Sequence, residues 1–256
     1  MPRRKSSAKG RLSAFSARRA LGFVAAGIIA AALAAGIRHA PRVLARMSVF
    51  QVQTLRLEGV TFLSEAEARQ AAGLHPASNI WEPKEVWIHG LESHPLVRSA
   101  RVRRIPPSTL AVRVVERTPV ALTAGSVVQP VDPEGILLPI DPVAAHLDLP
   151  ILLLNPTDST QALSLKRAAA VLSRIGDEVP DIYAVISDVQ YRDGEMILRL
   201  GDALTRLRFR PPVSQRRLRE GMAAMNDWSG RFDQGPPGEV DLRFEDQVLV
   251  RARSGP

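Results

Sequence analysis

Cysteine is absent from the 256 residues, and aromatic residues make up only 5% of them. Without cysteine the chain can form no disulfide, thiolate nucleophile or cysteine-ligated zinc site. The sequence also lacks the G-x-S-x-G, H-E-x-x-H, Walker and G-x-G-x-x-G motifs of common catalytic and nucleotide-binding sites. We therefore expect a non-enzymatic protein with no cofactor, whose folded part is stabilised by its hydrophobic core.

The five histidines give no pattern typical of a metal site. His89 and His94 could approach each other near a helix end, but no carboxylate lies at a suitable spacing. Ordinary surface or turn positions explain all five, so we predict no metal. An exported enzyme remains a third class of function, and it would require catalytic residues that the sequence does not present.

Acidic residues are missing from the first 46 residues, which contain ten lysines and arginines. This segment accounts for the formal net charge of +8, because the other 210 residues contain 24 basic and 26 acidic residues, a net charge of −2. A basic chain suggests nucleic-acid binding. The distribution argues against that function, and favours cations that set membrane topology and contact anionic headgroups.

An uncharged run of 18 residues, 20–37, lies between Arg18-Arg19 and Arg38. As a helix it would be about 27 Å long, close to the hydrocarbon thickness of about 30 Å. We predict a single transmembrane helix in the inner membrane. The basic tail 1–19 would be cytoplasmic and the remainder periplasmic, because lysine and arginine accumulate on the cytoplasmic side.

A cleaved signal peptide is the alternative interpretation of the same run. Ala32-Leu33-Ala34 could be a cleavage site, and Arg18-Arg19 resembles a twin-arginine signal. The run is longer than the usual signal core of about 7–15 residues, which favours an uncleaved anchor.

The first folded domain is predicted at 48–117, after a juxtamembrane linker at 38–47. Its opening segment ends at Gly59, and a capping box at Ser64 starts a helix that ends near Gly73. A second helix runs from Pro83 to before His94. Two strands, 97–104 and 110–114, then flank a turn, so the predicted order is β-α-α-β-β.

The second domain is predicted at 118–251, with a short tail at 252–256. Short apolar runs separated by turn residues indicate a strand-rich domain, and the whole chain is assigned to the α+β class. The expected elements are apolar runs at 126–131, 136–140 and 151–154, strands at 184–191, 195–200, 204–210 and 239–251, and two helices at 161–175 and 213–228. The first of these helices is expected to end at Gly176.

Arginines accumulate on the predicted hairpin of the first domain, notably Arg101, Arg103 and Arg113. A solvated strand face is one explanation. The other is a second docking face for an acidic partner or for lipid headgroups.

This layout resembles the FtsQ/DivIB family of bacterial cell-division proteins, which contain a POTRA module. The resemblance covers nearly the whole chain, and it rests on the order of several short motifs. These are Phe50-x-Val52-x-x-Leu55-x-Leu57-x-Gly59, Asn79-Ile80-Trp81, His94-Pro95-x-Val97, Arg103-Arg104-Ile105-Pro106, Val114-Val115-Glu116-Arg117-x-Pro119-Val120-Ala121, Val131-Asp132-x-x-Gly135, Leu149-Pro150-Ile151 and Val240-Asp241-Leu242-Arg243-Phe244.

The resemblance implies a single-pass scaffold of the division septum that binds FtsB-like and FtsL-like coiled-coil proteins and other septal membrane proteins. It implies that a partner strand adds to the final strand, with contacts from Arg243, Phe244, Gln247, Val248 and Val250. Arg243 would pair with a partner carboxylate and Phe244 would be an aromatic anchor, although Phe244 could instead be a core residue. The alternative function is another POTRA-containing envelope protein, in outer-membrane protein assembly or secretion.

Overall fold

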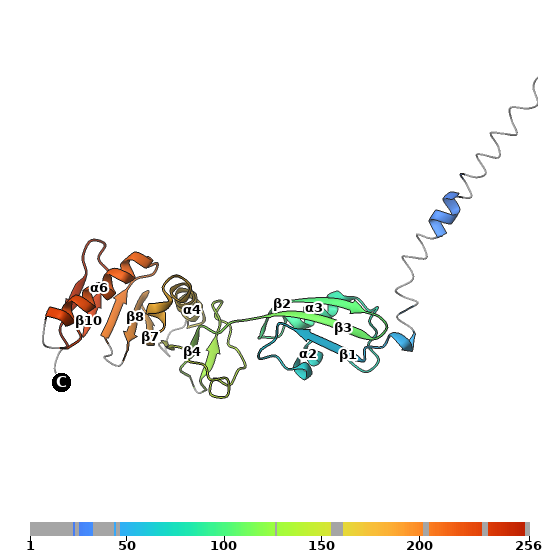
Figure 1. Ribbon diagram of the computed structural model, residues 1–256, viewed down its shortest axis with the longest axis horizontal. Coiled ribbons are helices and arrows are strands. Elements are labelled where there is room, and N and C mark those ends of the chain that lie inside the picture. Colours follow the sequence, from blue (N-terminus) through green and yellow to red (C-terminus); the bar gives the residue numbers. More distant parts are fainter. Residues whose placement is uncertain are drawn as a thin grey trace, which may run out of the picture. The chain divides into compact units, whose positions relative to one another are not determined.

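The computed structural model describes residues 23, 26–32, 44, 47–125, 127–154, 161–201, 205–231 and 235–253. The predicted tail 1–19 and most of the predicted span 20–37 lie outside the described residues. Within the described ranges, no helix is both long enough and apolar enough to cross a membrane. The chain divides into two compact units (Figure 1), the first formed by 1–58, 65–91 and 100–113, and the second by 59–64, 92–99 and 114–256.

A three-stranded sheet with two helices organises the first unit. Its strands lie in the order β1-β3-β2, with β1 parallel to β3. The chain order β-α-α-β-β agrees with the prediction. Residues 97–99 of β2 and 114–116 of β3 are grouped with the second unit. The elements are the 3₁₀ turn η1 (Ser48–Phe50), β1 (Thr54–Glu58), α2 (Glu65–Ala71), α3 (Lys84–Glu92), β2 (Val97–Ile105) and β3 (Thr109–Glu116).

Alternation along β1 and β3 separates a buried face of this sheet from an open one. Leu55 pairs with Leu110 and both are buried, whereas Glu58 pairs with Arg113 and both are exposed. Helix α3 contributes Trp87 to the buried side. The charged residues Glu58 and Arg113 of these two strands therefore lie on the open face.

Side-chain hydrogen bonds fix the chain where it enters the first unit. The Asn79 side-chain amide donates to the carbonyl of Met47 over 3.0 Å. The Trp81 ring meets Phe50 edge-on, with centroids 5.9 Å apart, and the Arg104 guanidinium lies 5.8 Å from the Trp81 ring centroid. The segment around Met47 is thus held against the 79–81 loop.

The second unit is built on an eight-stranded mixed sheet with the order β11-β10-β9-β8-β7-β6-β4-β5. The pairs β4–β6, β6–β7 and β9–β10 are parallel, and the others are antiparallel. The strands are β4 (Ala121–Thr123), β5 (Gln129–Val131), β6 (Ile151–Leu154), β7 (Ile186–Arg192), β8 (Glu195–Leu200), β9 (Thr205–Phe209), β10 (Glu239–Asp241) and β11 (Leu249–Arg251), and the helices are α4 (Gln161–Glu178), α5 (Pro180–Tyr183) and α6 (Gln215–Arg231).

One face of this sheet carries the hydrophobic core. Alternate strand residues such as Leu198 and Phe209 pack with Leu172 of α4 and Leu218 of α6. Figure 1 shows α4 and α6 on one side of this sheet. Within this core Tyr183 donates its hydroxyl to the carbonyl of Val120 over 2.7 Å, and burial raises the pKa of Tyr183 to about 12.

Three local predictions differ from the structure. Helix α4 continues past Gly176 to Glu178, because Gly176 keeps a helical backbone under the Tyr183 ring and Pro180 starts the next helix. The apolar run 136–140 forms only a single bridge, from Leu137 to Val131. The predicted final strand 239–251 is wrong as one strand, since β10 and β11 form an antiparallel pair joined by 242–248.

Candidate partner-binding site

Strand β11 lies at an edge of the eight-stranded sheet. It pairs only with β10, through Glu239–Arg251, Val240–Val250 and Asp241–Leu249. Within the described part of the chain, no strand lies on its other side. An edge of this kind presents backbone N–H and C=O groups to which another strand can add.

The opposite edge of the sheet, at β5, is covered by the chain that follows it. The Leu138 N–H donates to the carbonyl of Pro130 over 2.8 Å, and Leu137 bridges to Val131. Pro130 itself has no N–H to offer. The two edges of the sheet therefore differ, and β11 is the one open to strand addition.

The loop 242–248 between β10 and β11 is held by an arginine of α6. The Arg217 guanidinium donates to the carbonyls of Phe244 and Gln247, and the Gln247 contact is 2.7 Å. Glu220 in turn accepts from Arg217 at 2.7 Å. These bonds define the loop conformation that turns the chain from β10 into β11.

Phe244 lies in this loop with 44% of its surface exposed, so it is not a core residue. A cavity of about 330 Å³ adjoins it, with Phe209 and Leu242 among the apolar lining residues and Arg210 among the polar ones. An exposed aromatic ring next to a cavity with apolar lining is a suitable contact for a partner side chain.

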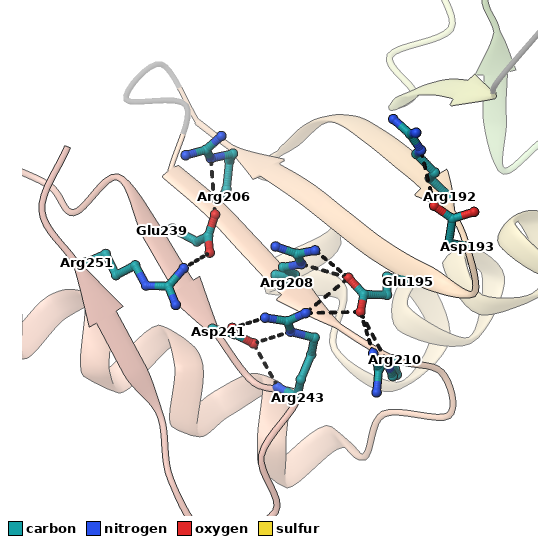
Figure 2. Close-up of polar contacts among 10 residues, drawn as sticks. All are labelled: Arg192, Asp193, Glu195, Arg206, Arg208, Arg210, Glu239, Asp241, Arg243 and Arg251. Atoms are coloured by element: carbon teal, nitrogen blue, oxygen red, sulfur yellow. Dashed lines mark hydrogen bonds and ion pairs between the residues drawn. The ribbon is translucent and has the colours of Figure 1, made fainter. Parts of the chain in front are cut away.

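Arg243 points to two carboxylates of its own chain (Figure 2). Its guanidinium donates to Asp241 at 2.7 Å and to Glu195 at 3.1 Å, and 21% of the side chain remains exposed. The hydrogen bond from Arg243 is the largest influence on the pKa of Asp241 and holds it below its ordinary value. The guanidinium is therefore oriented before any partner arrives.

Glu195, which sequence reasoning did not single out, is the centre of this network. It follows the Asp193-Gly194 hairpin turn and accepts from Arg208 at 2.6 Å and from Arg210 at 2.8 Å. Burial alone would raise the pKa of Glu195, but the hydrogen bonds from Arg208, Arg243 and Arg210 lower it to about 2. No local motif marks Glu195, since its partner Arg243 is 48 residues away.

This network predicts acid sensitivity of the second unit. A carboxylate whose pKa falls from 4.5 to about 2 on folding stabilises the protein above pH 4.5, and that contribution is lost as the pH falls toward 2. We expect the unfolding equilibrium constant to rise by up to about tenfold per pH unit in this window. Urea unfolding of the full chain between pH 6 and pH 2 measures it. The Glu195→Gln variant should show a shallower dependence, and an identical slope would contradict the assignment.

The other residues predicted to bind a partner occupy different environments. Gln247 is exposed in the loop, whereas Val248 and Val250 are partly buried and pack against the core. Val250 lies on the edge strand itself. All five predicted positions thus lie in one segment, 243–250, but only Phe244 and Gln247 are exposed.

The arginines of the predicted second docking face, Arg101, Arg103 and Arg113, lie together on the open face of the three-stranded sheet. In the residues that the structure describes, no group of three or more metal-binding side chains is placed to hold an ion.

The fold and its sheets define an α+β protein with a POTRA domain. Residues 50–117 match the FtsQ-type POTRA domain. Over 224 residues the chain is 25% identical to cell division protein FtsQ of Koribacter versatilis (strain Ellin345), an alignment that covers 79% of this chain and 60% of that protein. The resemblance to FtsQ proteins inferred from the sequence is confirmed.

Proposed function

We propose that this protein is a non-enzymatic, single-pass scaffold of bacterial cell division. In this proposal the β11 edge and Phe244 bind an FtsB-like protein, in assembly with FtsL-like and other septal membrane proteins. The similarity to an FtsQ protein and the FtsQ-type POTRA domain support the cell-division role. The observation that carries the binding mode is the asymmetry of the sheet, with β5 covered and β11 open.

Several physical features favour strand addition at this edge. Main-chain hydrogen bonds supply affinity, and neighbouring side chains supply specificity. Phe244 offers apolar area beside the edge, and Arg217 holds its loop, which reduces the ordering required on binding. The predicted span 20–37 would tether this edge near the inner membrane, where other single-span proteins lie.

Replacing Phe244 by alanine tests the site in the full chain. Loss of an exposed aromatic anchor should weaken binding of an FtsB-like protein by about tenfold or more, because hot-spot truncations cost more than about 1–2 kcal/mol. Titration calorimetry or surface plasmon resonance measures the change. Arg243→Glu is less informative, because it would place a third carboxylate beside Asp241 and Glu195.

Val127→Ala is the matched control, since Val127 is 67% exposed near the covered β5 edge. The Val127→Ala variant should bind an FtsB-like protein with the same affinity as the unmodified chain. Hydrogen exchange supplies a second readout, in which the amides of Leu249–Arg251 become protected on binding. Undiminished affinity of Phe244→Ala, together with unchanged exchange in β11, would show that the partner binds elsewhere.

A further inference from the structure

The open face of the three-stranded sheet carries a cluster of arginines around a small apolar floor. Ala111 on the central strand β3 is buried, and it pairs with Arg56 on β1. A hollow of about 460 Å³ lies on this face. Its lining residues are Glu58, Arg101, Val102, Arg103, Ala111 and Arg113.

The cluster has an excess of positive charge that its own acids do not balance. Glu58 pairs with Arg113 at 3.3 Å, in an exposed contact. Among the residues that the structure describes, Arg56, Arg101 and Arg103 have no ion-pair partner. Guanidinium groups gathered in this way bind oxyanions through paired N–H donors.

The polar face of the eight-stranded sheet shows that arginines on an open sheet face can be paired. Arg199 contacts Asp188 at 2.7 Å, and Arg251 contacts Glu239 at 3.0 Å. Arg208, Arg210 and Arg243 all contact Glu195. The unpaired arginines of the three-stranded sheet therefore distinguish its face from the other one.

Protection of a sheet edge does not account for the whole cluster. Cations on an edge strand such as β2 discourage pairing with another sheet. Arg113, however, lies on β3, the central strand of the order β1-β3-β2. Edge protection therefore leaves the position of Arg113 unexplained.

The chain places this face within reach of a membrane. Ten residues, 38–47, separate the predicted span from η1, and an extended chain of that length spans at most about 35 Å. The bond from Asn79 to Met47 holds the end of this linker on the first unit. The linker would therefore keep the first unit close to the phosphates of the lipid headgroups.

We infer that the arginine hollow of the three-stranded sheet binds the phosphates of anionic phospholipids and so holds the first unit at the membrane surface. The inference rests on the proposed function for its membrane anchor. Each exposed arginine near an anionic surface contributes roughly fivefold to the affinity. Because this attraction is electrostatic, it weakens as salt shortens the screening length.

Arginine labelling of the full chain in nanodiscs tests the inference. The discs contain phosphatidylcholine alone or phosphatidylcholine with phosphatidylglycerol, and phenylglyoxal labelling is read by peptide mass spectrometry. Arg101 and Arg103 should label roughly fivefold more slowly in the anionic discs, and high salt should remove the difference. Arg216, with 87% of its side chain exposed on α6, is the control and should label equally in both discs.

The double variant Arg101→Gln with Arg103→Gln changes only exposed side chains, so it should fold. Its Arg56 and Arg113 should lose the lipid-dependent protection. A chain that enters the discs but labels equally in both overturns the lipid site alone, whereas a chain that fails to enter them overturns the proposed anchor. Protection that appears only when an acidic protein partner is added also overturns the lipid site and assigns the hollow to that partner.

Discussion

Replacing Gly90 by alanine should destabilise the first unit by about 3 kcal/mol. A Cβ atom at Gly90 would lie 2.3 Å from the carbonyl oxygen of Ala71, and 3.3 Å from the Cα atom of Ala72. These atoms belong to the backbone at the end of α2, so no side-chain rotation can relieve the overlap. Helices α2 and α3 would have to separate, which would open the core around Trp87.

Gly230→Ala is the matched control for this substitution. Gly230 lies in α6, and nothing lies within 4 Å of a Cβ atom built there. Alanine is the better helix former by about 1 kcal/mol, so this variant should be unchanged or more stable. Hydrogen exchange of α2 and α3 in the full chain measures the effect at Gly90. A Gly90→Ala protein with unchanged exchange there would show that the helices do not approach so closely.

Replacing Arg117 by methionine should destabilise the second unit by about 3 kcal/mol, because it removes the cation from a buried carboxylate. Arg117 donates to Asp132 over 2.7 Å, and Asp132 is fully buried in the turn before Gly135. Burial alone would raise the pKa of Asp132, but the hydrogen bonds donated by the Ile136 N–H and the Arg117 guanidinium hold it below its ordinary value. Methionine keeps much of the volume and leaves the charge uncompensated.

Glu134→Gln separates this effect from the loss of an exposed contact. Glu134 also accepts from Arg117 at 2.7 Å, but 42% of its side chain is exposed. An exposed ion pair of that kind contributes about 0–1 kcal/mol to stability. The Glu134→Gln variant should therefore unfold at nearly the same urea concentration as the unmodified chain. Urea unfolding of both variants in parallel measures the two costs. Equal small shifts would mean that the Asp132 carboxylate reaches solvent.

Local sequence patterns correctly predicted the helices and strands that begin or end at residues with strong turn or capping preferences. Strands β6 and β8 occupy the predicted ranges. The start of β8 is set locally, because Asp193 and Gly194 before it both adopt the positive φ angles that a tight hairpin requires. The β-α-α-β-β order was predictable for the same reason, from a capping box and alternating strands. The end of α4 was not predicted, because it depends on Tyr183 of the next helix packing over Gly176. The division of 239–251 depends on a distant contact, since Arg217 of α6 holds the loop 242–248.

The candidate site illustrates the same limit. The sequence analysis placed Arg243 and Phe244 within the final strand 239–251, and the structure places them in the loop between β10 and β11. The carboxylate of Glu195 reaches Arg243 only because β9 lies between β8 and β10, and β10 returns parallel to β9 after α6. Such a crossover leaves no periodic signal near Glu195, so its role could not be predicted.

The position of β11 in the chain has a kinetic consequence. β10 adds to β9 only after α6 has been made, and β11 adds only to β10, so the open edge is the last part of this sheet to emerge during synthesis. Non-local strand pairings also form slowly, because loop closure precedes them. A partner strand that requires this edge can therefore bind only chains whose sheet is complete. Nascent or partly folded copies do not yet have the β11 edge with which it would pair.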